Sequence, residues 1–406
     1  MSEIERRKIK VVWICHFTNE EVQSLLKVWK NANEFAPWIP NFLRGFENNK
    51  DVEIHVIAPH DYLRRKTKFE LRNIQYHFIP FGIPFVHRHW PSYFRLDVYS
   101  NFIFFRKKVR KIINEIKPDL INLMGAENSY YSASILDVKE NYPILICIQG
   151  FISEFNDEPN KSKELKNRIH FEEKILKSFK YFCGEQDSSN YISGYNPEHK
   201  FFKLYFPVNE NLIPGLKDMS KSYDCIYFGR LEKSKGAEDF IRVIGEIKKM
   251  KPSVKAFITG MGDLFPLQHL AEELNCSKNI EFHPFIKSQD KLFEYVKASK
   301  VLLVPTHKER LPATIRESMM LKVPIVAYST GGIPYINEFS ENIYLVDTGD
   351  YKKMAQKTLN LIESEPLRNQ LANRAYNYCI SEYKCEINTE RLISAYYNIL
   401  NNYENK

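Results

Sequence analysis

Two glutamates, Glu309 and Glu317, lie eight residues apart in the segment VPTHKERLPATIRESMM, which begins at Val304. An apolar run over 301–304 predicts a buried strand, and Pro312 suits the first turn of a helix. The helix N-terminus then opens at the carboxyl end of a parallel strand, where backbone N–H groups and the helix dipole favour a phosphate. One glutamate precedes the helix and the other lies in its second turn. We therefore expect them to contact separate parts of an extended ligand, not to face each other as in a hydrolase.

Three further motifs accompany this segment. They are Phe228-Gly229-Arg230-Leu231 with Lys235-Gly236, then Ile258-Thr259-Gly260-Met261-Gly262-Asp263, then Thr330-Gly331-Gly332-Ile333-Pro334. Each motif alone is a weak signal, because a lone G-x-G occurs by chance. Together, and in this order, they make the chain resemble the retaining group 1 (family 4) glycosyltransferases with the GT-B fold. The chain shows the variant of the E-x7-E region in which x-Leu-Pro replaces Gly-Phe-Gly after the first glutamate.

The resemblance implies a nucleoside-diphosphate sugar as donor. Breaking its sugar–phosphate bond requires cations and N–H donors that stabilise the charge developing on the leaving phosphate. Arg230 and Lys235 match the family's phosphate-binding pair, and Glu309 would contact the donor sugar, so these three are the expected catalytic residues. Glu317 would accept hydrogen bonds from the ribose hydroxyls. The remaining expected donor-binding residues are Gly260, Gly262, Leu311, Pro312, Ala313, Thr314 and Ile286.

Alternatives remain for several of these residues. Arg230 is also compatible with a surface ion pair to Glu232, and Glu317 with an ordinary helix residue. Gly331 and Gly332 suit a tight turn near the site better than direct contact with the ligand.

The acceptor side departs from the family pattern. Many relatives carry a histidine after the strand that follows a Pro-Asp pair, but residues 118–125 read PDLINLMG. Gln149-Gly150 likewise stands where His-Gly is common. The candidate acceptor contacts are therefore His16, Asn122, Glu127 and Gln149, although His16 also suits a capping role. The implied mechanism is front-face attack with the leaving phosphate as base, which needs no dedicated nucleophile.

The expected reaction is transfer of a hexosyl group, with retention, from a UDP- or GDP-sugar to a saccharide or lipid-linked saccharide in surface polysaccharide or glycolipid synthesis. One alternative is a nucleotide-sugar epimerase or a sucrose-phosphate-type synthase on the same fold. Another is a non-catalytic nucleotide-sugar-binding protein, which would have no need for both phosphate cations beside a sugar-facing carboxylate. Sequence does not distinguish the donor base, the sugar, the acceptor, the linkage or the oligomeric state.

Strands and helices alternate along the chain and must position these residues. The length of 406 residues suits two domains. The pattern includes a long basic helix over 96–116 and restarts near residue 224. The expected fold class is α/β, of the GT-B type, with two Rossmann-like doubly wound domains facing each other across a cleft. The expected boundaries are 1–208 for the acceptor-binding domain, 209–222 for a linker, 223–380 for the nucleotide-sugar-binding domain, and 381–406 for a C-terminal helix that crosses back to the first domain.

Composition limits the other possibilities. Hydrophobic residues make up 44% and charged residues 27%, as in a globular protein. No apolar run approaches the ~20 residues of a membrane span, and MSEIERRKIK lacks a signal-peptide core, so we expect a cytoplasmic protein. The seven cysteines form no C-x-x-C pair and are expected to be reduced core residues. Without a D-x-D motif, zinc spacing or a G-x-G-x-x-G fingerprint after the first strand, we expect no metal and no cofactor beyond the donor as co-substrate.

The net charge of +8 includes two basic clusters, over 64–68 and 106–111. They are compatible with solvated surfaces or with attraction to an anionic acceptor or membrane, which would place the protein peripherally at the inner face of a membrane. Nucleic acid is not an expected partner, because no recognised binding module accompanies the charge. The aromatic segments 35–46 and 81–94 suit core packing or an acceptor- or lipid-facing groove.

Overall fold

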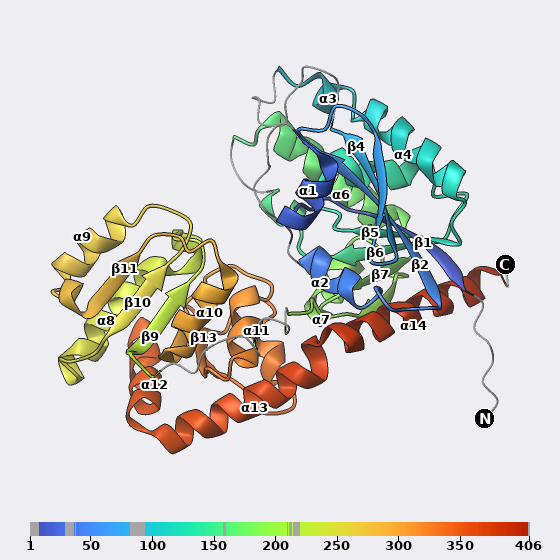
Figure 1. Cartoon of the computed structure of the whole chain (residues 1–406). Coiled ribbons are helices and arrows are strands. Elements are labelled where there is room, and N and C mark those ends of the chain that lie inside the picture. The colour runs from blue at the N-terminus through green and yellow to red at the C-terminus, as the bar shows by residue number, and fades with distance from the viewer. Residues whose placement is uncertain are drawn as a thin grey trace, which may run out of the picture. The chain divides into compact units, whose positions relative to one another are not determined.

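The computed structural model describes residues 8–28, 36, 38–81, 94–156, 160–208, 210, 213 and 220–404. The chain divides into two compact units, Met1–Pro207 with Cys385–Lys406, and Val208–Lys384 (Figure 1). The last helix, α14 (Cys385–Glu404), therefore belongs to the same unit as the N-terminal half of the chain. Most of the expected linker, 209–222, lies outside the described residues.

The first unit contains a sheet of order β3-β4-β2-β1-β5-β6-β7-β8. All neighbouring strands are parallel except β3 and β4, which form an antiparallel hairpin. Sequence analysis did not predict β3, a polar strand at the sheet edge. The strands are β1 (Ile9–Ile14), β2 (Val52–His60), β3 (Thr67–Leu71), β4 (Ile74–Pro80), β5 (Leu120–Met124), β6 (Ile144–Ile148), β7 (Tyr181–Gly184) and β8 (Lys200–Lys203).

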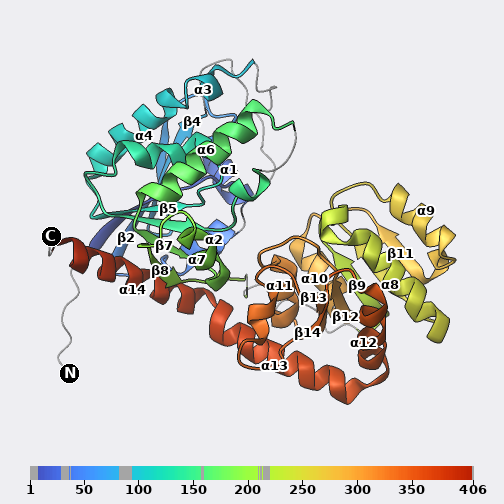
Figure 2. The ribbon, with the colours of Figure 1, turned by 180° about the vertical axis from the view of Figure 1, so that it is seen from behind.

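Helices cover both faces of this sheet, because its central strands are apolar on both sides (Figures 1 and 2). Residues from α14 and α2 pack on one face, and residues from α4 and α6 pack on the other. The helices are α1 (Glu20–Leu26), α2 (Trp38–Arg44), α3 (Leu96–Tyr99), α4 (Ile103–Ile116), α5 (Ser129–Ser132), α6 (Lys163–Ser178) and α7 (Gln186–Ser193), with the 3-10 helices η2 (Ala133–Asp137) and η3 (Ser153–Phe155).

The single helix expected over 96–116 is wrong, because the chain turns between α3 and α4. Asn101 and Phe102 have φ values of 50° and 55°, in the left-handed region that interrupts a helix. The Phe102 N–H donates to the Asp97 carbonyl over 2.8 Å and closes the turn. This break could not be predicted from the sequence, because neither residue is a glycine or a proline.

The second unit contains a sheet of order β11-β10-β9-β12-β13-β14, in which all neighbouring strands are parallel. The strands are β9 (Tyr223–Phe228), β10 (Ala256–Thr259), β11 (Ile280–His283), β12 (Ser299–Val304), β13 (Ile325–Tyr328) and β14 (Tyr344–Val346). The helices are α8 (Ala237–Met250), α9 (Phe265–Glu273), α10 (Gln289–Lys297), α11 (Ala313–Met320), α12 (Tyr351–Glu363) and α13 (Glu365–Tyr383), with the 3-10 helices η5 (Lys233–Lys235), η6 (Ser277–Asn279) and η7 (Ile333–Asn337).

Two buried histidines on β2 and β4 make the first unit sensitive to acid. His55 Nδ1 and His77 Nε2 lie 3.2 Å apart, and His55 Nε2 lies 2.7 Å from a carboxylate oxygen of Glu53. Burial, reinforced by the positive charges of neighbouring side chains, lowers the pKa of His77 to about 4. Those neighbours are His55, Lys68 and Lys66, and only Glu115 acts in the opposite direction.

We expect replacement of His77 by glutamine to reduce the loss of thermal stability on acidification. An unfolded histidine binds a proton near pH 6.5, whereas native His77 binds one near pH 4. The stability that depends on neutral His77 is therefore fully present above pH 6.5 and is lost as the pH falls toward 4. The check is Tm against pH between about pH 7 and pH 5, with exposed His269→Gln as control. Equal slopes for the two variants and the wild type would contradict this account.

Candidate functional site

The strand order of the second sheet reverses between β9 and β12, which lie side by side. From β9 the chain continues to β10 on one side, and it later returns to β12 on the other. In an open parallel sheet, ligands bind at such a point, outside the carboxyl ends of the strands. Arg230 and Lys235 follow β9, and Glu309 follows β12. The topology therefore brings the three expected catalytic residues to the same edge of the sheet.

A cavity of about 140 Å³ lies at this edge. Its walls come from the end of β9, the end of β12 and the start of α11. The expected site residues that line it are Arg230, Lys235, Glu309, Pro312, Ala313 and Thr314. Pro312 is the N-cap of α11 and offers no side-chain acceptor to the first-turn N–H groups. Such N–H groups at a helix N-terminus favour an anion.

Lys235 and Glu309 form an ion pair in this cavity. Their side chains are only 16% and 27% exposed, so water screens the pair less than it screens a surface pair. Lys235 Nζ also donates to the Lys308 carbonyl over 3.2 Å, and the Arg310 N–H donates to the second Glu309 oxygen over 3.1 Å. Besides the ion pair itself, both contacts come from the Glu309 loop, which therefore helps to hold the cation and the carboxylate in place.

The loops that carry this pair are fastened to each other through their backbones. The Ser234 carbonyl accepts from the His307 N–H at 2.9 Å and from Thr306 Oγ1 at 3.2 Å. Gly236 has φ +75°, and a Cβ there would lie 1.8 Å from the Pro305 carbonyl oxygen. Only glycine permits this approach, so the position of η5 relative to the Glu309 loop depends on it.

Arg230 is the most exposed of the expected catalytic residues. Its side chain is 54% exposed, and Nη1 lies 3.2 Å from a carboxylate oxygen of Glu232. The surface pair considered from the sequence is therefore present, although Arg230 also lines the cavity. An exposed pair of this kind is worth little, so its partner is readily exchanged for a ligand phosphate.

Gly260 and Gly262 hold the turns after β9 and β10 together. A Cβ on Gly260 would lie 1.6 Å from the Gly229 carbonyl oxygen, and one on Gly262 would lie 2.8 Å from Leu231 Cβ. The Leu231 N–H donates to the Met261 carbonyl over 2.8 Å. These glycines therefore fix the loop that carries Arg230, and their close neighbours are protein atoms.

Glu317 lies outside the residues that line the cavity, one helical turn beyond Ala313. Residues four apart share a helix face, so Glu317 lies on the same face of α11 as Ala313. Its carboxylate accepts from Gln289 Nε2 over 3.0 Å, and burial raises its pKa. Ile286, in the loop before Gln289, is buried. Sequence analysis missed Gln289, because nothing in its local pattern indicates a contact with a residue 28 positions away.

Asp239 is a second residue that sequence analysis missed. This buried residue in the first turn of α8 accepts from Tyr328 Oη over 3.0 Å and contacts His307 Nε2 at 2.8 Å. Because His307 lies two residues before Glu309, Asp239 positions the loop that carries that carboxylate.

We expect Asp239→Asn to destabilise the protein by about 1–3 kcal/mol, because an amide cannot accept from all the donors around it. We also expect ligand binding in the cavity to weaken more than any rate of catalysis falls, since the loop loses its position while Lys235 and Glu309 keep their chemistry. Thermal unfolding and steady-state kinetics test this. Glu238→Gln is the control, because Glu238 lies in the same turn and both carboxylates accept from Arg242. Equal effects of the two substitutions would contradict a positioning role for Asp239.

In the first unit, the strand order reverses between β1 and β5. His16 follows β1, Glu127 follows β5, and Gln149 follows β6, so three acceptor-side candidates share the carboxyl edge of neighbouring strands. His16 Nδ1 lies 2.6 Å from Tyr130 Oη, and both residues are buried. Burial raises the pKa of Glu127, whose backbone carbonyl accepts from Arg168 over 2.9 Å. Gln149 is exposed.

Asn122 is the candidate that the structure separates from the others. It lies inside β5, fully buried, and its Nδ2 donates to Tyr396 Oη over 2.8 Å. Trp13 Nε1 donates to the same hydroxyl over 2.9 Å. Asn122 therefore helps to fasten α14 to the sheet and offers no accessible surface to an acceptor.

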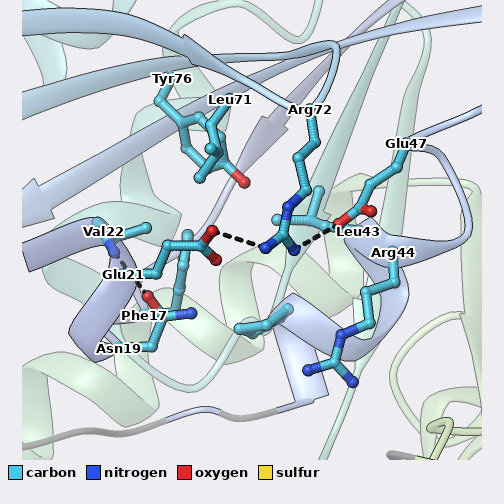
Figure 3. Close-up of a pocket in the computed structure, with 11 residues that line it drawn as sticks. Phe17, Asn19, Glu21, Val22, Leu43, Arg44, Glu47, Leu71, Arg72 and Tyr76 are labelled. Carbon is cyan, nitrogen blue, oxygen red and sulfur yellow. Dashed lines mark hydrogen bonds and ion pairs between the residues drawn. The ribbon is translucent and has the colours of Figure 1, made fainter. Parts of the chain in front are cut away.

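A smaller cavity of about 40 Å³ lies beside α1 in the same unit (Figure 3). Arg72 reaches between two carboxylates there, 2.7 Å from Glu21 and 3.1 Å from Glu47. These contacts tie the β3–β4 turn to α1 and to the segment after α2. We assign this cavity a structural role.

The aromatic segments have different outcomes. Trp38, Phe42 and Phe46 pack in the core, as the core-packing interpretation of 35–46 predicts. Of 81–94, only Phe81 and Phe94 are described, and 82–93 lie outside the described residues. All seven cysteines are buried, and none of them forms a disulfide.

Among the described residues, no three His, Cys, Asp or Glu side chains are arranged to bind a metal. In the same part of the chain, no helix combines the length and the apolar character needed to cross a bilayer. The expected independence from metal and cofactor and the expected cytoplasmic location remain predictions.

The two sheets and their topology define a GT-B protein, as solved structures of that fold show. The chain superimposes on sucrose-phosphate synthase from Thermosynechococcus elongatus with a TM-score of 0.71 and 12% identity, covering 98% of this chain and all (100%) of the other. It superimposes on HepE from Anabaena, solved in complex with UDP, with a TM-score of 0.63 and 13% identity, covering 96% and 100%. At such identities the similarity establishes the fold alone.

Residues 209–378, less than half of the chain, match the family model described as glycosyl transferases group 1. The capsular polysaccharide biosynthesis glycosyltransferase CapM of Staphylococcus aureus is 26% identical, over 52% of this chain and 51% of the relative. The chain spans about half the length of the curated relatives it matches first.

Proposed function

We propose that this protein is a retaining glycosyltransferase that moves a sugar from a UDP- or GDP-sugar to a saccharide or lipid-linked saccharide in surface polysaccharide or glycolipid synthesis. The observation that carries the proposal is the cavity at the strand-order reversal of the second sheet. There, the Lys235–Glu309 ion pair lies beside the N-terminus of α11. A cationic group, a carboxylate and helix N–H groups in one place suit a ligand that joins a diphosphate to a sugar.

In this proposal the diphosphate binds between Lys235 and the first turn of α11. Arg230 leaves Glu232 and binds a phosphate oxygen. Together with Lys235 it then stabilises the negative charge that develops on the leaving phosphate, which lowers the barrier to transfer. Glu309 turns from Lys235 to the sugar hydroxyls. The acceptor hydroxyl attacks from the face that the phosphate leaves, and its proton passes to the phosphate, so configuration is retained.

The nucleoside extends along α11 toward Glu317. The carboxylate of Glu317 accepts hydrogen bonds from the ribose hydroxyls. The hydrogen bond that Gln289 Nε2 donates to one of its oxygens orients this carboxylate. The base lies near Ile286, where backbone groups recognise it. Glu317 has two oxygens, of which Gln289 uses one, so the second is available for a hydroxyl.

On the acceptor side we propose contacts by His16, Glu127 and Gln149, which follow neighbouring strands of the first sheet. Asn122 is not part of this proposal. The assignment to polysaccharide or glycolipid synthesis draws support from the name of the S. aureus relative, and the nucleotide from the UDP complex of HepE.

The experiment is a thermal-shift panel of UDP-, GDP-, ADP- and CMP-sugars in the absence of added metal. A ligand that binds the native state raises Tm according to its concentration relative to Kd. The donor that shifts Tm is then incubated with saccharide and lipid-linked acceptors, and the anomeric configuration of the product is read by NMR. One shifting nucleotide class and a product of unchanged configuration would support the proposal. A shift without any transfer would favour a binding protein, and inversion would refute the mechanism.

A further inference from the structure

A group of large apolar side chains is exposed on the first unit where α3 meets α4. Elsewhere in this unit such residues mostly lie in the two core clusters. Contiguous exposed apolar surface on a soluble protein commonly marks an interaction site. The group, here called the apolar patch, consists of Phe94 (60% exposed), Leu96 (61%), Tyr99 (51%), Ile103 (40%) and Phe104 (51%).

The turn between α3 and α4 is what exposes these residues. Leu96 and Tyr99 are three apart and share one face of α3, whose other face buries Asp97 and Val98. After the left-handed residues at 101–102, Phe102 is buried while Ile103 and Phe104 open α4 on its outer face. Because α3 lies at the N-terminal end of α4 (Figure 1), the two short apolar faces lie at that end.

The outer face of α4 continues from apolar to basic. Lys107, Arg110 and Lys111 are exposed and stand three or four residues from Phe104 or from one another, so they share its side of the helix. Arg106 turns aside to an ion pair with Asp137. The one exposed carboxylate on the rest of this face, Glu115, is paired with Lys66. An apolar end followed by cations is the arrangement that binds an anionic lipid surface.

The patch also adjoins the edge where the acceptor candidates lie. The chain leaves β4 at the carboxyl edge of the sheet, and α4 ends at Ile116, directly before β5 begins at the amino edge. The N-terminus of α4 therefore lies toward the carboxyl edge. Ring contacts link the two places, from Phe102 to Tyr130 at 6.5 Å and from Tyr130 to His16 at 5.3 Å.

We propose that the apolar patch, with Lys107, Arg110 and Lys111, docks the protein on an anionic lipid bilayer beside the acceptor-side edge. The apolar side chains enter the headgroup region while the cations contact lipid phosphates. A lipid-linked acceptor could then reach His16 and Glu127 without leaving the bilayer, a consequence that rests on the proposed function. The basic cluster over 64–68 is not needed for this surface.

The test is flotation of the full chain with vesicles of phosphatidylcholine alone or mixed with phosphatidylglycerol. We expect binding to the mixed vesicles only, weakened by salt. Lys107→Glu with Lys111→Glu should weaken binding to the mixed vesicles by at least about thirty-fold, since each of the two cations near such a surface contributes about 1 kcal/mol. Ile103→Ser with Phe104→Ser should weaken it by at least about ten-fold, because two large apolar side chains no longer enter the headgroup region. Phe339→Ser and Lys352→Glu with Lys353→Glu, at exposed positions of the second unit, are the matched controls.

Three results would overturn the proposal. They are no binding to mixed vesicles, an equal loss in the controls, and self-association that the patch variants abolish without any vesicle binding, which would mean that a second copy covers the patch. The donor-induced rise in Tm serves as an independent check. It should be the same in the patch variants and the wild type, so failure of lipid docking remains distinguishable from failure of the donor assignment.

Discussion

Replacement of Lys235 by alanine is expected to lower kcat for sugar transfer by about 10²–10³-fold, the loss typical of one preorganised group that stabilises developing charge. Lys235 is the cation whose position is held by the Glu309 loop, through the Glu309 carboxylate and the Lys308 carbonyl. Because its charge matters most when the phosphate leaves, KM for the donor should change much less than kcat. The measurement is release of nucleoside diphosphate from the donor that the thermal-shift panel identifies.

Lys233→Ala is the matched control for this result. Lys233 belongs to the same 3-10 helix, η5, and is exposed. The substitution removes the same charge from the same element, so any general effect of net charge or of η5 stability appears in both variants. If both variants lose activity equally, or if Lys235→Ala changes only KM, Lys235 does not act on the leaving phosphate.

Gly331→Ala is expected to have the second largest effect, although Gly331 need not touch the ligand. Its φ is +54°, and a Cβ there would lie 1.6 Å from the Glu309 carbonyl oxygen and 3.3 Å from that of Arg310. The Gly332 N–H also donates to the Arg310 carbonyl over 2.7 Å. The alanine must push the Glu309 loop away, so we expect a loss of at least about 2 kcal/mol of stability and most of the activity.

Gly349→Ala distinguishes backbone strain from the steric clash of a Cβ as the cause of that loss. Its φ of +89° also lies in the left-handed region, but the space that a Cβ would occupy there is open. Gly349→Ala should therefore show the backbone strain without the collision, and it should leave activity unchanged. Chemical denaturation and kinetics on both variants measure the difference. Equal activities in the two would show that the Glu309 loop tolerates displacement and that the site is less preorganised than proposed.

Sequence reasoning identified the second sheet and the edge at which its candidate site residues gather, because these depend on local patterns. Buried strands appear as short apolar runs, and Pro312 marks the first turn of α11. The order of the motifs along the chain then placed Arg230, Lys235 and Glu309 at the ends of β9 and β12. Strand ends follow from sequence once the strands are parallel, since all their carboxyl ends share one edge.

What sequence reasoning missed depends on contacts between distant residues or on unusual backbone. The contacts of Gln289 with Glu317, of Asp239 with His307 and of Asn122 with Tyr396 join residues 28, 68 and 274 positions apart. No local pattern encodes such pairs. The break of the expected 96–116 helix arises at two non-glycine residues with positive φ, which propensity does not predict. The apolar patch was missed with it, because an unbroken helix would have buried different side chains.

The most direct test of the central claim, that the second unit binds a nucleoside-diphosphate sugar along α11, is calorimetric titration of the preferred nucleoside diphosphate into the wild type and Glu317→Ala. Loss of a carboxylate that accepts from two ribose hydroxyls should weaken binding by about ten- to a hundred-fold. Glu338→Ala, at an exposed position of the same unit, should leave Kd unchanged. If Glu317→Ala binds as tightly as the wild type, the nucleoside does not lie along α11 and the proposed donor site is wrong.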